Sequence, residues 1–331
     1  MSKVARTLLA GLIATTAFAV GVAPAEGGDS ELTIFHAGSL AVPFRQLCRE
    51  FTKLHPGLRI RREVAGSRVC ARKVSALGKR CDVLACADYT VIEDLLINTA
   101  PPRDAEWVIK FAGNEMVIAF RKGWDWASRI NRDNWPDVLL SDRVAFGRSD
   151  PNSDPCGYRS LLLMQLAERF YGRPGLARQL AAKDRRYIRP KEIDLLALLE
   201  VGEIDCIFIY RSVAEQHRLK YMTLPESINL GSDKHAQFYR TASVRLSGKK
   251  PGTYITKQAE PIIYGVTIPK NAPNPQLAQA FLEFLLSPDK GGRILSANGQ
   301  RFLVPSPSRT YRHIPPSLKP YARPQEEPPS K

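Results

Sequence analysis

Two short loops near the start of the chain have residue types that suit the binding of a small oxyanion. Gly38 and Ser39 stand between a strand-like run and a helix-like run, and so do Gly66 and Ser67. Glycine lets the backbone approach a ligand, a serine hydroxyl donates a hydrogen bond, and the free N–H groups at a helix start attract an anion. A serine that only caps its helix would give the same pattern. The presence of two such loops favours a binding site.

A third polar segment, residues 149–159, precedes another helix-like run and contains Asn152, Ser153 and Asp154. Asp154 is placed to cap that helix, and a cap with a turn is a sufficient explanation for these residue types. The functional alternative is that Asp154 gives a carboxylate oxygen to a high-valent metal atom at the centre of an oxyanion. The segment alone leaves both interpretations open.

The sequence lacks the motifs of common catalytic sites. Its five histidines form no recognisable set with serine and aspartate, and no Gly-x-Ser-x-Gly, Walker or dinucleotide-binding motif is present. Cys156 follows Asp154 and Pro155 at a helix start, so it is either an activated thiol of low pKa or a buried structural thiol. We expect a binding protein and no enzyme, with an enzyme or sensor that uses Cys156 as the alternative.

The elements that must position these loops alternate along the chain between strand and helix. Three strand-like and three helix-like runs follow one another at 32–35, 44–54, 59–64, 67–77, 82–87 and 90–97. We expect Thr90 to cap the last helix. Such alternation predicts a largely parallel sheet covered by helices, with a ligand crevice beyond the carboxyl ends of the strands. The glycine–serine loops follow strands, where this crevice is expected.

Two apolar stretches, residues 107–120 and 262–268, enclose a second α/β unit. Leaving one lobe and returning to it through two strands is how a two-lobed protein forms a hinge. We therefore expect lobe I to comprise residues 26–110 and 265–304, and lobe II to comprise residues 111–264.

The two ends of the chain differ from this pattern. Residues 1–25 contain Lys3 and Arg6, a short apolar run and a final Ala-Pro-Ala, which together are typical of a cleaved signal peptide. We therefore expect a periplasmic or secreted protein. Residues 305–331 contain eight prolines and almost no apolar periodicity, which predicts a Pro-rich tail that is extended or disordered.

Charge and cysteine content narrow the possible partners. The 331 residues include 48 Lys and Arg against 33 Asp and Glu, a formal net charge of +15, but the basic residues are spread along the whole chain, so we expect no nucleic-acid partner. In an exported protein six cysteines could form three disulfides, or they could be buried thiols. The six are Cys48, Cys70, Cys81, Cys86, Cys156 and Cys206.

Four segments in order, residues 34–40, 65–67, 154–159 and 210–217, closely resemble the tungstate/molybdate-binding proteins of ABC importers. The similarity runs from about residue 31 to residue 303. It implies a type II periplasmic-binding-protein fold, which is an α/β fold with two lobes of mixed, mostly parallel sheet joined by a two-segment hinge. It also implies a monomer that captures molybdate or tungstate, needs no other cofactor, and delivers the anion to an inner-membrane permease.

The resemblance also implies which residues surround the oxyanion. These are Gly38, Ser39, Ser67, Asn152, Ser153, Asp154 and Tyr210. In this arrangement hydroxyls and backbone N–H groups bind the oxo groups, and Tyr210 or a neighbour closes the second lobe.

Archaeal members of the family add two carboxylates that make the metal atom six-coordinate. Asp154 matches the first, while the second is expected just before Tyr210, where this chain has Ile209. The resemblance therefore implies either a tetrahedral anion with Asp154 close by or a replacement carboxylate such as Glu203 or Glu215. A retuned site for sulfate, phosphate or another small ligand is the alternative.

Overall fold

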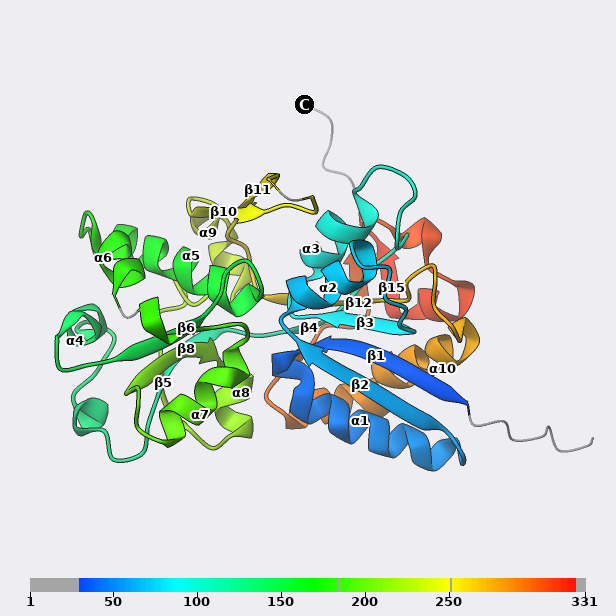
Figure 1. The fold of residues 1–331 in the computed structure, drawn as a ribbon, viewed down its shortest axis with the longest axis horizontal. Helices are drawn as coiled ribbons and strands as arrows, with labels where there is room; N and C mark the ends of the chain where they lie inside the picture. Colours follow the sequence, from blue (N-terminus) through cyan, green and yellow to red (C-terminus); the bar gives the residue numbers. More distant parts are fainter. Residues whose placement is uncertain (1–29, 184, 251, 326–331) are drawn as a thin grey trace, which may run out of the picture.

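The chain forms two lobes, each built around its own sheet (Figure 1). The computed structural model describes residues 30–183, 185–250 and 252–325. The expected signal peptide, residues 1–25, lies outside the described residues. Within the described ranges, no helix is long and apolar enough to cross a bilayer.

Lobe I contains a six-stranded sheet in the order β13-β4-β12-β3-β1-β2. Its strands are β1 (Glu31–Ala37), β2 (Arg59–Ala65), β3 (Val83–Cys86), β4 (Ile109–Gly113), β12 (Ile263–Thr267) and β13 (Arg301–Phe302). β1 runs parallel to β2 and β3, as the βαβ pattern predicts, whereas β12 and β13 pair antiparallel with their neighbours. The sheet is therefore mixed, because β12 and β13 run against β1, β2, β3 and β4.

The helices of lobe I follow the expected apolar spacing. They are α1 (Ala41–Leu54), α2 (Ser67–Ser75), α3 (Tyr89–Ile92), a π-helical turn (Glu93–Ile97), α10 (Pro275–Leu286) and α11 (Arg293–Ala297). Phe44, Leu47 and Phe51 recur on one face of α1 and are buried.

The residue that caps α3 is not the one expected from the sequence. Thr90 does not cap this helix, because Asp88 occupies the N-cap position and its carboxylate accepts a hydrogen bond from the Thr90 backbone N at 2.9 Å. A carboxylate has no hydroxyl hydrogen to orient and is favoured by the helix dipole, so Asp88 is the stronger cap of the two.

Lobe II contains a five-stranded sheet in the order β7-β6-β8-β5-β9. Its strands are β5 (Met116–Phe120), β6 (Phe146–Ser149), β7 (Ile188–Arg189), β8 (Cys206–Tyr210) and β9 (Lys220–Thr223). Its helices are α4 (Trp135–Leu140), α5 (Pro155–Phe170), α6 (Leu176–Ala182), α7 (Leu195–Glu200), α8 (Arg211–Gln216) and α9 (Ala236–Tyr239). A separate hairpin pairs β10 (Ser243–Ser247) with β11 (Tyr254–Gln258).

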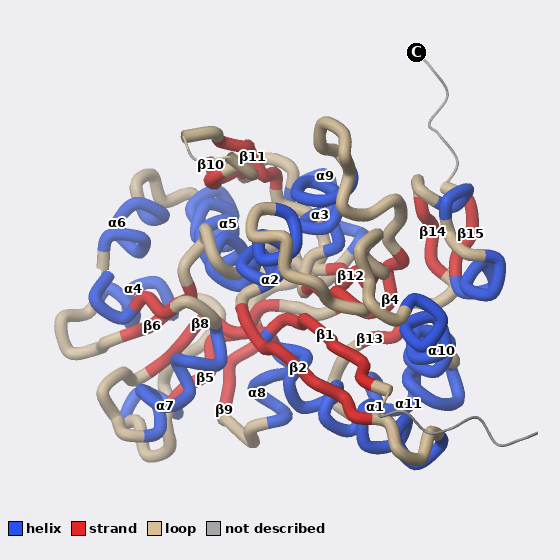
Figure 2. Tube along the Cα trace, turned by 45° about the vertical axis from the view of Figure 1, so that its right-hand side comes forward, coloured by secondary structure: helices blue, strands red, loops and turns tan. Residues whose placement is uncertain are grey.

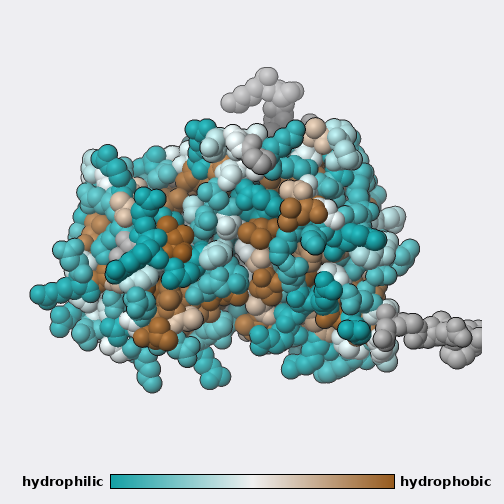
Figure 3. Space-filling model, in the orientation of Figure 1, coloured by the Kyte–Doolittle hydropathy of each residue, from teal (hydrophilic) through white to brown (hydrophobic). Residues whose placement is uncertain are grey.

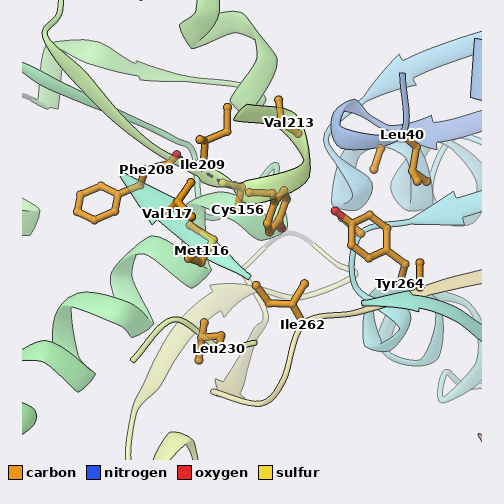
Figure 4. Close-up of a cluster of buried hydrophobic side chains, with 14 of the residues drawn as sticks. Leu40, Met116, Val117, Cys156, Phe208, Ile209, Val213, Leu230, Ile262 and Tyr264 are labelled. Atoms are coloured by element: carbon orange, nitrogen blue, oxygen red, sulfur yellow. Dashed lines mark hydrogen bonds between the residues drawn. The ribbon is translucent and has the colours of Figure 1, made fainter. Parts of the chain in front are cut away.

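The chain passes between the lobes twice. The first passage is at residues 114–115, between β4 and β5, and the return is at residues 259–262, between β11 and β12. The boundaries expected from the sequence fall inside β4 and β12. At the first boundary, the continuous apolar stretch 107–120 contains β4 of one sheet and β5 of the other. Figure 4 shows the apolar side chains packed around these passages, with Leu40 and Tyr264 from lobe I facing Cys156 and Ile209 from lobe II.

Residues 305–325 are not an extended or disordered tail, contrary to the expectation. β14 (Ser306–Ser308) pairs in parallel with β15 (Ala322–Pro324), and the two strands lie at the outer edge of lobe I (Figure 2). Ile314 and Leu318 between them are buried. The prolines suit the 3-10 turns and short strands used here, so a proline-rich composition does not prevent packing. Residues 326–331 lie outside the described part of the chain.

The cysteines do not form the candidate set of three disulfides. Cys48, Cys70, Cys81, Cys86 and Cys156 are buried free thiols, and Cys206 is buried as well. Burial raises the pKa of both Cys48 and Cys70 to about 12. These side chains therefore serve as small core residues. The face shown in Figure 3 is largely hydrophilic, as expected when apolar side chains gather in the interior.

Candidate functional site

The glycine–serine loops of lobe I meet the polar segment of lobe II at the interface between the lobes. Gly66 packs directly on the carbonyl oxygen of Ser153, and a Cβ placed on Gly66 would overlap that oxygen and lie 3.1 Å from the Cβ of Asp154. Only glycine permits this approach. Residues expected from the sequence to share a site are thus brought together from opposite lobes.

The two predicted serines are buried, and each accepts a hydrogen bond from the protein. The Ser67 Oγ accepts from the Ala87 backbone N at 2.9 Å, and the Ser39 Oγ accepts from the Tyr264 hydroxyl at 3.0 Å. Tyr264 in turn accepts from the Asn114 side-chain amide at 2.9 Å. A hydroxyl that already accepts can direct its own hydrogen towards a ligand oxygen. Both serines are therefore arranged as donors to an anion.

Asp154 occupies the N-cap position of α5 but does not cap the helix through its side chain. Its Oδ2 instead accepts from the backbone N of Glu192 at 3.2 Å, while its Oδ1 is buried without a protein hydrogen-bond partner. Asp154 thus holds the N-cap position without the side-chain hydrogen bond that a simple cap would make. A buried carboxylate oxygen without a donor requires an explanation, and a ligand at this position would provide one.

Glu192 is the carboxylate that sequence reasoning missed. It begins a 3-10 turn (Glu192–Asp194) that leads into α7, its side chain is fully buried, and neither carboxylate oxygen has a hydrogen-bond partner. A Cβ on Gly38 would lie 2.9 Å from Oε1 and 3.0 Å from Oε2. The carboxylate of Glu192 therefore lies against the first glycine–serine loop, beside Asp154.

The two carboxyl groups influence each other's protonation. Burial raises the pKa of Asp154. Burial also raises the pKa of Glu192 well above its ordinary range, and the charge of Asp154 adds to this effect. The raised pKa values favour a protonated carboxyl group in this pair when no ligand is bound. Charged binding partners must then either displace that proton or accept a hydrogen bond from it.

The expected replacement carboxylates are not in the site. Glu203 accepts from the Tyr187 hydroxyl at 3.1 Å, and Glu215 pairs with Arg211 at 2.8 Å. Ile209 is a core residue of lobe II and packs among apolar side chains (Figure 4). The buried carboxyl group that does lie beside Asp154 is that of Glu192, 17 positions before Ile209 in the chain.

Asn152 and Ser153 lie at the site, but their side chains are engaged elsewhere. The Asn152 Oδ1 accepts from the backbone N and the hydroxyl of Ser247 at 2.9 and 2.7 Å, and the Ser153 hydroxyl donates to Asp150 at 3.3 Å. Their backbone N–H groups are engaged as well, because both donate to Asp150, at 2.8 Å from Asn152 and 3.1 Å from Ser153. Their predicted role is therefore narrower than the sequence suggested.

Tyr210 is buried at the end of β8, and its hydroxyl accepts from the Arg159 guanidinium at 2.8 Å. Arg159 also donates to the Ala87 carbonyl at 2.7 Å and lies 3.4 Å from Asp88, both in lobe I. Burial alone would raise the pKa of Asp88, but the Lys257 ammonium and the Arg159 guanidinium hold it well below its usual range. Tyr210 therefore sits on a buried ion pair that joins the lobes.

Cys156 does not have the environment of a nucleophile. Its thiol is fully buried and donates to the Phe208 carbonyl oxygen at a sulfur–oxygen distance of 3.6 Å. Burial raises the pKa of the thiol well above its ordinary value. An activated cysteine needs the opposite shift.

The donor set suits an oxyanion better than a bare cation. Within the described residues, no cluster of three or more His, Cys, Asp or Glu side chains could hold a metal ion. The site combines the hydroxyls of Ser39 and Ser67 with the carboxyl pair of Asp154 and Glu192. Neutral donors of this kind hold a desolvated oxyanion in a fixed geometry.

Comparison with known proteins supports the same class of function. The sequence model of bacterial extracellular solute-binding proteins matches residues 32–301. An uncharacterized solute-binding protein of Petrotoga mobilis is 48% identical over 300 residues, which are 90% of this chain and 92% of that protein. The molybdate/tungstate-binding protein WtpA of Pyrococcus abyssi is 43% identical over 313 residues, with 84% of this chain and 88% of that protein covered.

A solved structure shows the same fold. The periplasmic molybdate-binding protein of Azotobacter vinelandii matches with a TM-score of 0.57 at 18% identity, over 81% of this chain and 98% of that chain. The match confirms the two-lobed α/β fold expected from the sequence. Because the family model also covers most of its length, the chain belongs to the family of bacterial extracellular solute-binding proteins.

Proposed function

We propose that this protein captures molybdate or tungstate between its lobes and delivers the anion to the permease of an ABC importer. One observation carries the choice of ligand: beside the two serine loops, Asp154 and Glu192 place three buried carboxyl oxygens that accept no hydrogen bond from any other residue. The name of the Pyrococcus abyssi relative, a molybdate/tungstate-binding protein, supports the same choice. The oxyanion is the cargo in this role, and no resident cofactor is required.

The carboxylate pair separates these anions from other dianions by chemistry. Molybdenum(VI) and tungsten(VI) can accept further oxygen ligands, so an ionised carboxylate can bond to the metal atom and offset its repulsion from the oxo groups. Sulfur in sulfate and phosphorus in phosphate offer no such bond. For them, the pair either keeps its proton and donates one hydrogen bond, or ionises and adds repulsion and desolvation, and in neither case does a carboxylate bond to the central atom.

Calorimetric titration of the purified protein at physiological salt tests the ligand class. We expect submicromolar binding of tungstate and molybdate and no measurable binding of sulfate or phosphate. Comparable heat from sulfate or phosphate would mean that the lobes close on a different cargo.

Substitution of the two carboxylates tests the proposed coordination. Glu192→Gln and Asp154→Asn should each weaken tungstate binding at least about tenfold, or about 1.4 kcal/mol, because an amide oxygen is a poorer metal ligand. Glu203→Gln is the matched control, since Glu203 bonds to Tyr187 outside the site, and it should leave the affinity unchanged.

X-ray absorption of the tungstate complex gives a second, independent readout. Six oxygen neighbours around tungsten in the wild type and fewer in Glu192→Gln are expected. Four neighbours in both proteins would remove the carboxylates from the metal shell.

Delivery to a permease is supported by membership in the family of extracellular solute-binding proteins. Deleting the gene for this protein should abolish high-affinity tungstate uptake by cells that produce it. Uptake that continues at nanomolar tungstate would contradict this part of the proposal.

A further inference from the structure

The β10–β11 hairpin belongs to lobe II but reaches across to lobe I. On the lobe II side it is tied to α5, because the Gln165 side chain donates to the Ser243 carbonyl at 2.8 Å and accepts from the Ser243 backbone N at 3.1 Å. Figure 1 shows the hairpin above the junction of the lobes, between α5 and α3. Its far end contacts lobe I through charged side chains.

Two arginines of α2 in lobe I hold the backbone of lobe II. Arg68 donates to the carbonyl oxygens of Asn152, at 3.3 Å, and of Ser247. Arg72, one helical turn later, donates to the same two oxygens at 2.7 and 3.0 Å and to the Gly248 carbonyl at 3.3 Å. The guanidinium forks thus bridge the polar segment and the hairpin of lobe II.

Two lysines of the hairpin reach from lobe II to side chains of lobe I. Lys249 forms an ion pair with Asp104 of lobe I at 3.0 Å. Lys257 bonds to the Thr90 hydroxyl and lies 3.9 Å from Asp88. The hairpin is therefore held on lobe I by arginine side chains of lobe I and lysine side chains of lobe II.

These contacts are connected directly to the candidate site. Arg68 follows Ser67 in the chain, and Asn152 precedes Ser153 and Asp154. The Asn152 carbonyl accepts from both arginines, while its side chain accepts from Ser247. A movement that separates the lobes must therefore break the arginine contacts next to the loops that surround the ligand.

We propose that Arg68 and Arg72 are positioning residues that form a clasp, which holds the lobes closed on the oxyanion and sets how slowly it is released. This inference rests on the proposed function. Both arginines bond to backbone carbonyls of lobe II, and their contacts form only when the lobes come together. The clasp therefore acts after the anion has entered, on the closed state, and contributes to the dissociation rate more than to the association rate.

The test measures tungstate binding kinetics by stopped flow for Arg72→Lys, Arg68→Lys and the double variant. A lysine is a point donor and cannot bridge two carbonyl oxygens as a guanidinium does. We expect the dissociation rate constant to rise about tenfold or more in the double variant, with the association rate constant within about threefold of the wild type.

Arg80→Lys is the matched control. Arg80 also donates to a backbone carbonyl, that of Asn271 at 3.1 Å, but both residues lie in lobe I. The control should leave both rate constants unchanged. Arg68 is buried, so its variant could fold poorly; Arg72 is only half-buried and carries the test in that case.

The outcomes separate the two proposals. Wild-type protein that binds tungstate, together with folded Arg72→Lys and double variants that release it at the wild-type rate, would overturn the clasp alone. A slower association with unchanged dissociation would also overturn it, because that result points to recognition of the free anion. Wild-type protein that binds neither tungstate nor molybdate would contradict the proposed function instead.

Discussion

The two lobes contribute opposite chemistry to one site. Lobe I offers neutral donors, the hydroxyls of Ser39 and Ser67, each already oriented by a hydrogen bond that it accepts. Lobe II offers the carboxyl groups of Asp154 and Glu192, of which only the Asp154 Oδ2 accepts a backbone hydrogen bond. The neutral half suits any tetrahedral oxyanion, whereas the acidic half suits only an anion whose central atom can bind carboxylate oxygen. If the protein binds molybdate or tungstate as proposed, lobe I supplies mainly affinity and lobe II mainly selectivity.

The largest expected effect comes from keeping the two halves apart. Gly66→Ala would place a methyl group against the Ser153 carbonyl, so the lobes could not close fully. We expect tungstate affinity to fall at least about a hundredfold, or about 2.7 kcal/mol, by calorimetry. The backbone of Gly66 has φ −58°, which alanine adopts readily, so the thermal midpoint of the ligand-free protein should not fall. Near wild-type affinity would show that the lobes need not touch here.

Removing one hydroxyl from the neutral half should have a smaller and less selective effect. Ser39→Ala and Ser67→Ala should each weaken tungstate and molybdate binding by the same factor, between about two- and tenfold, which corresponds to one hydrogen bond of about 0.5–1.5 kcal/mol. Ser153→Ala is the control, because its hydroxyl bonds to Asp150. A serine variant that changes the preference between the two anions would contradict the division between the lobes.

The smallest effect is on the stability of the ligand-free protein as pH changes. Burial raises the pKa of Asp154 and Glu192, so the folded protein holds more protons there than the unfolded chain does. The stability linked to these protons is present at low pH and is lost as pH rises through the raised pKa of the pair.

Comparing the wild type with Glu192→Gln separates the pH-dependent stability contributed by this carboxyl pair from the contributions of other groups. His36 acts in the opposite sense, because burial lowers its pKa to about 4 and its contribution is lost as pH falls. His36 is present in both proteins, so the difference in free energy of unfolding reports the carboxyl pair. We expect the variant to gain stability relative to wild type as pH rises from 5 to 8. Parallel curves from urea denaturation would argue against a shared proton.

The neutral half of the site could be predicted from the sequence and the acidic half only in part. Gly38, Ser39, Gly66 and Ser67 follow strands of a regular βα pattern, and the topology places the ends of those strands together. Asp154 stands out because it precedes a long apolar helix. Each of these positions can be recognised from the sequence as the end of a strand or the start of a helix.

Glu192 carries no such signal. It follows Lys191 just before a short helix, where an acidic residue usually lies in solvent and interacts with the helix dipole. Only the packing of that turn on Gly38 buries the side chain. The hairpin of residues 243–258 was also not predicted, because its role depends on contacts with residues far away in the chain.

Asn114, in the first passage between the lobes, connects both lobes to one of the serine loops. It lies where the chain first leaves lobe I, and its side-chain amide donates both to the Ser212 hydroxyl in lobe II, at 2.7 Å, and to Tyr264, whose hydroxyl donates to Ser39. The direction of the Ser39 hydroxyl is thus coupled, through Tyr264, to a residue in the first passage between the lobes. A movement that breaks the Asn114–Ser212 bond would therefore also alter the hydrogen bonds that orient a hydroxyl of the candidate site.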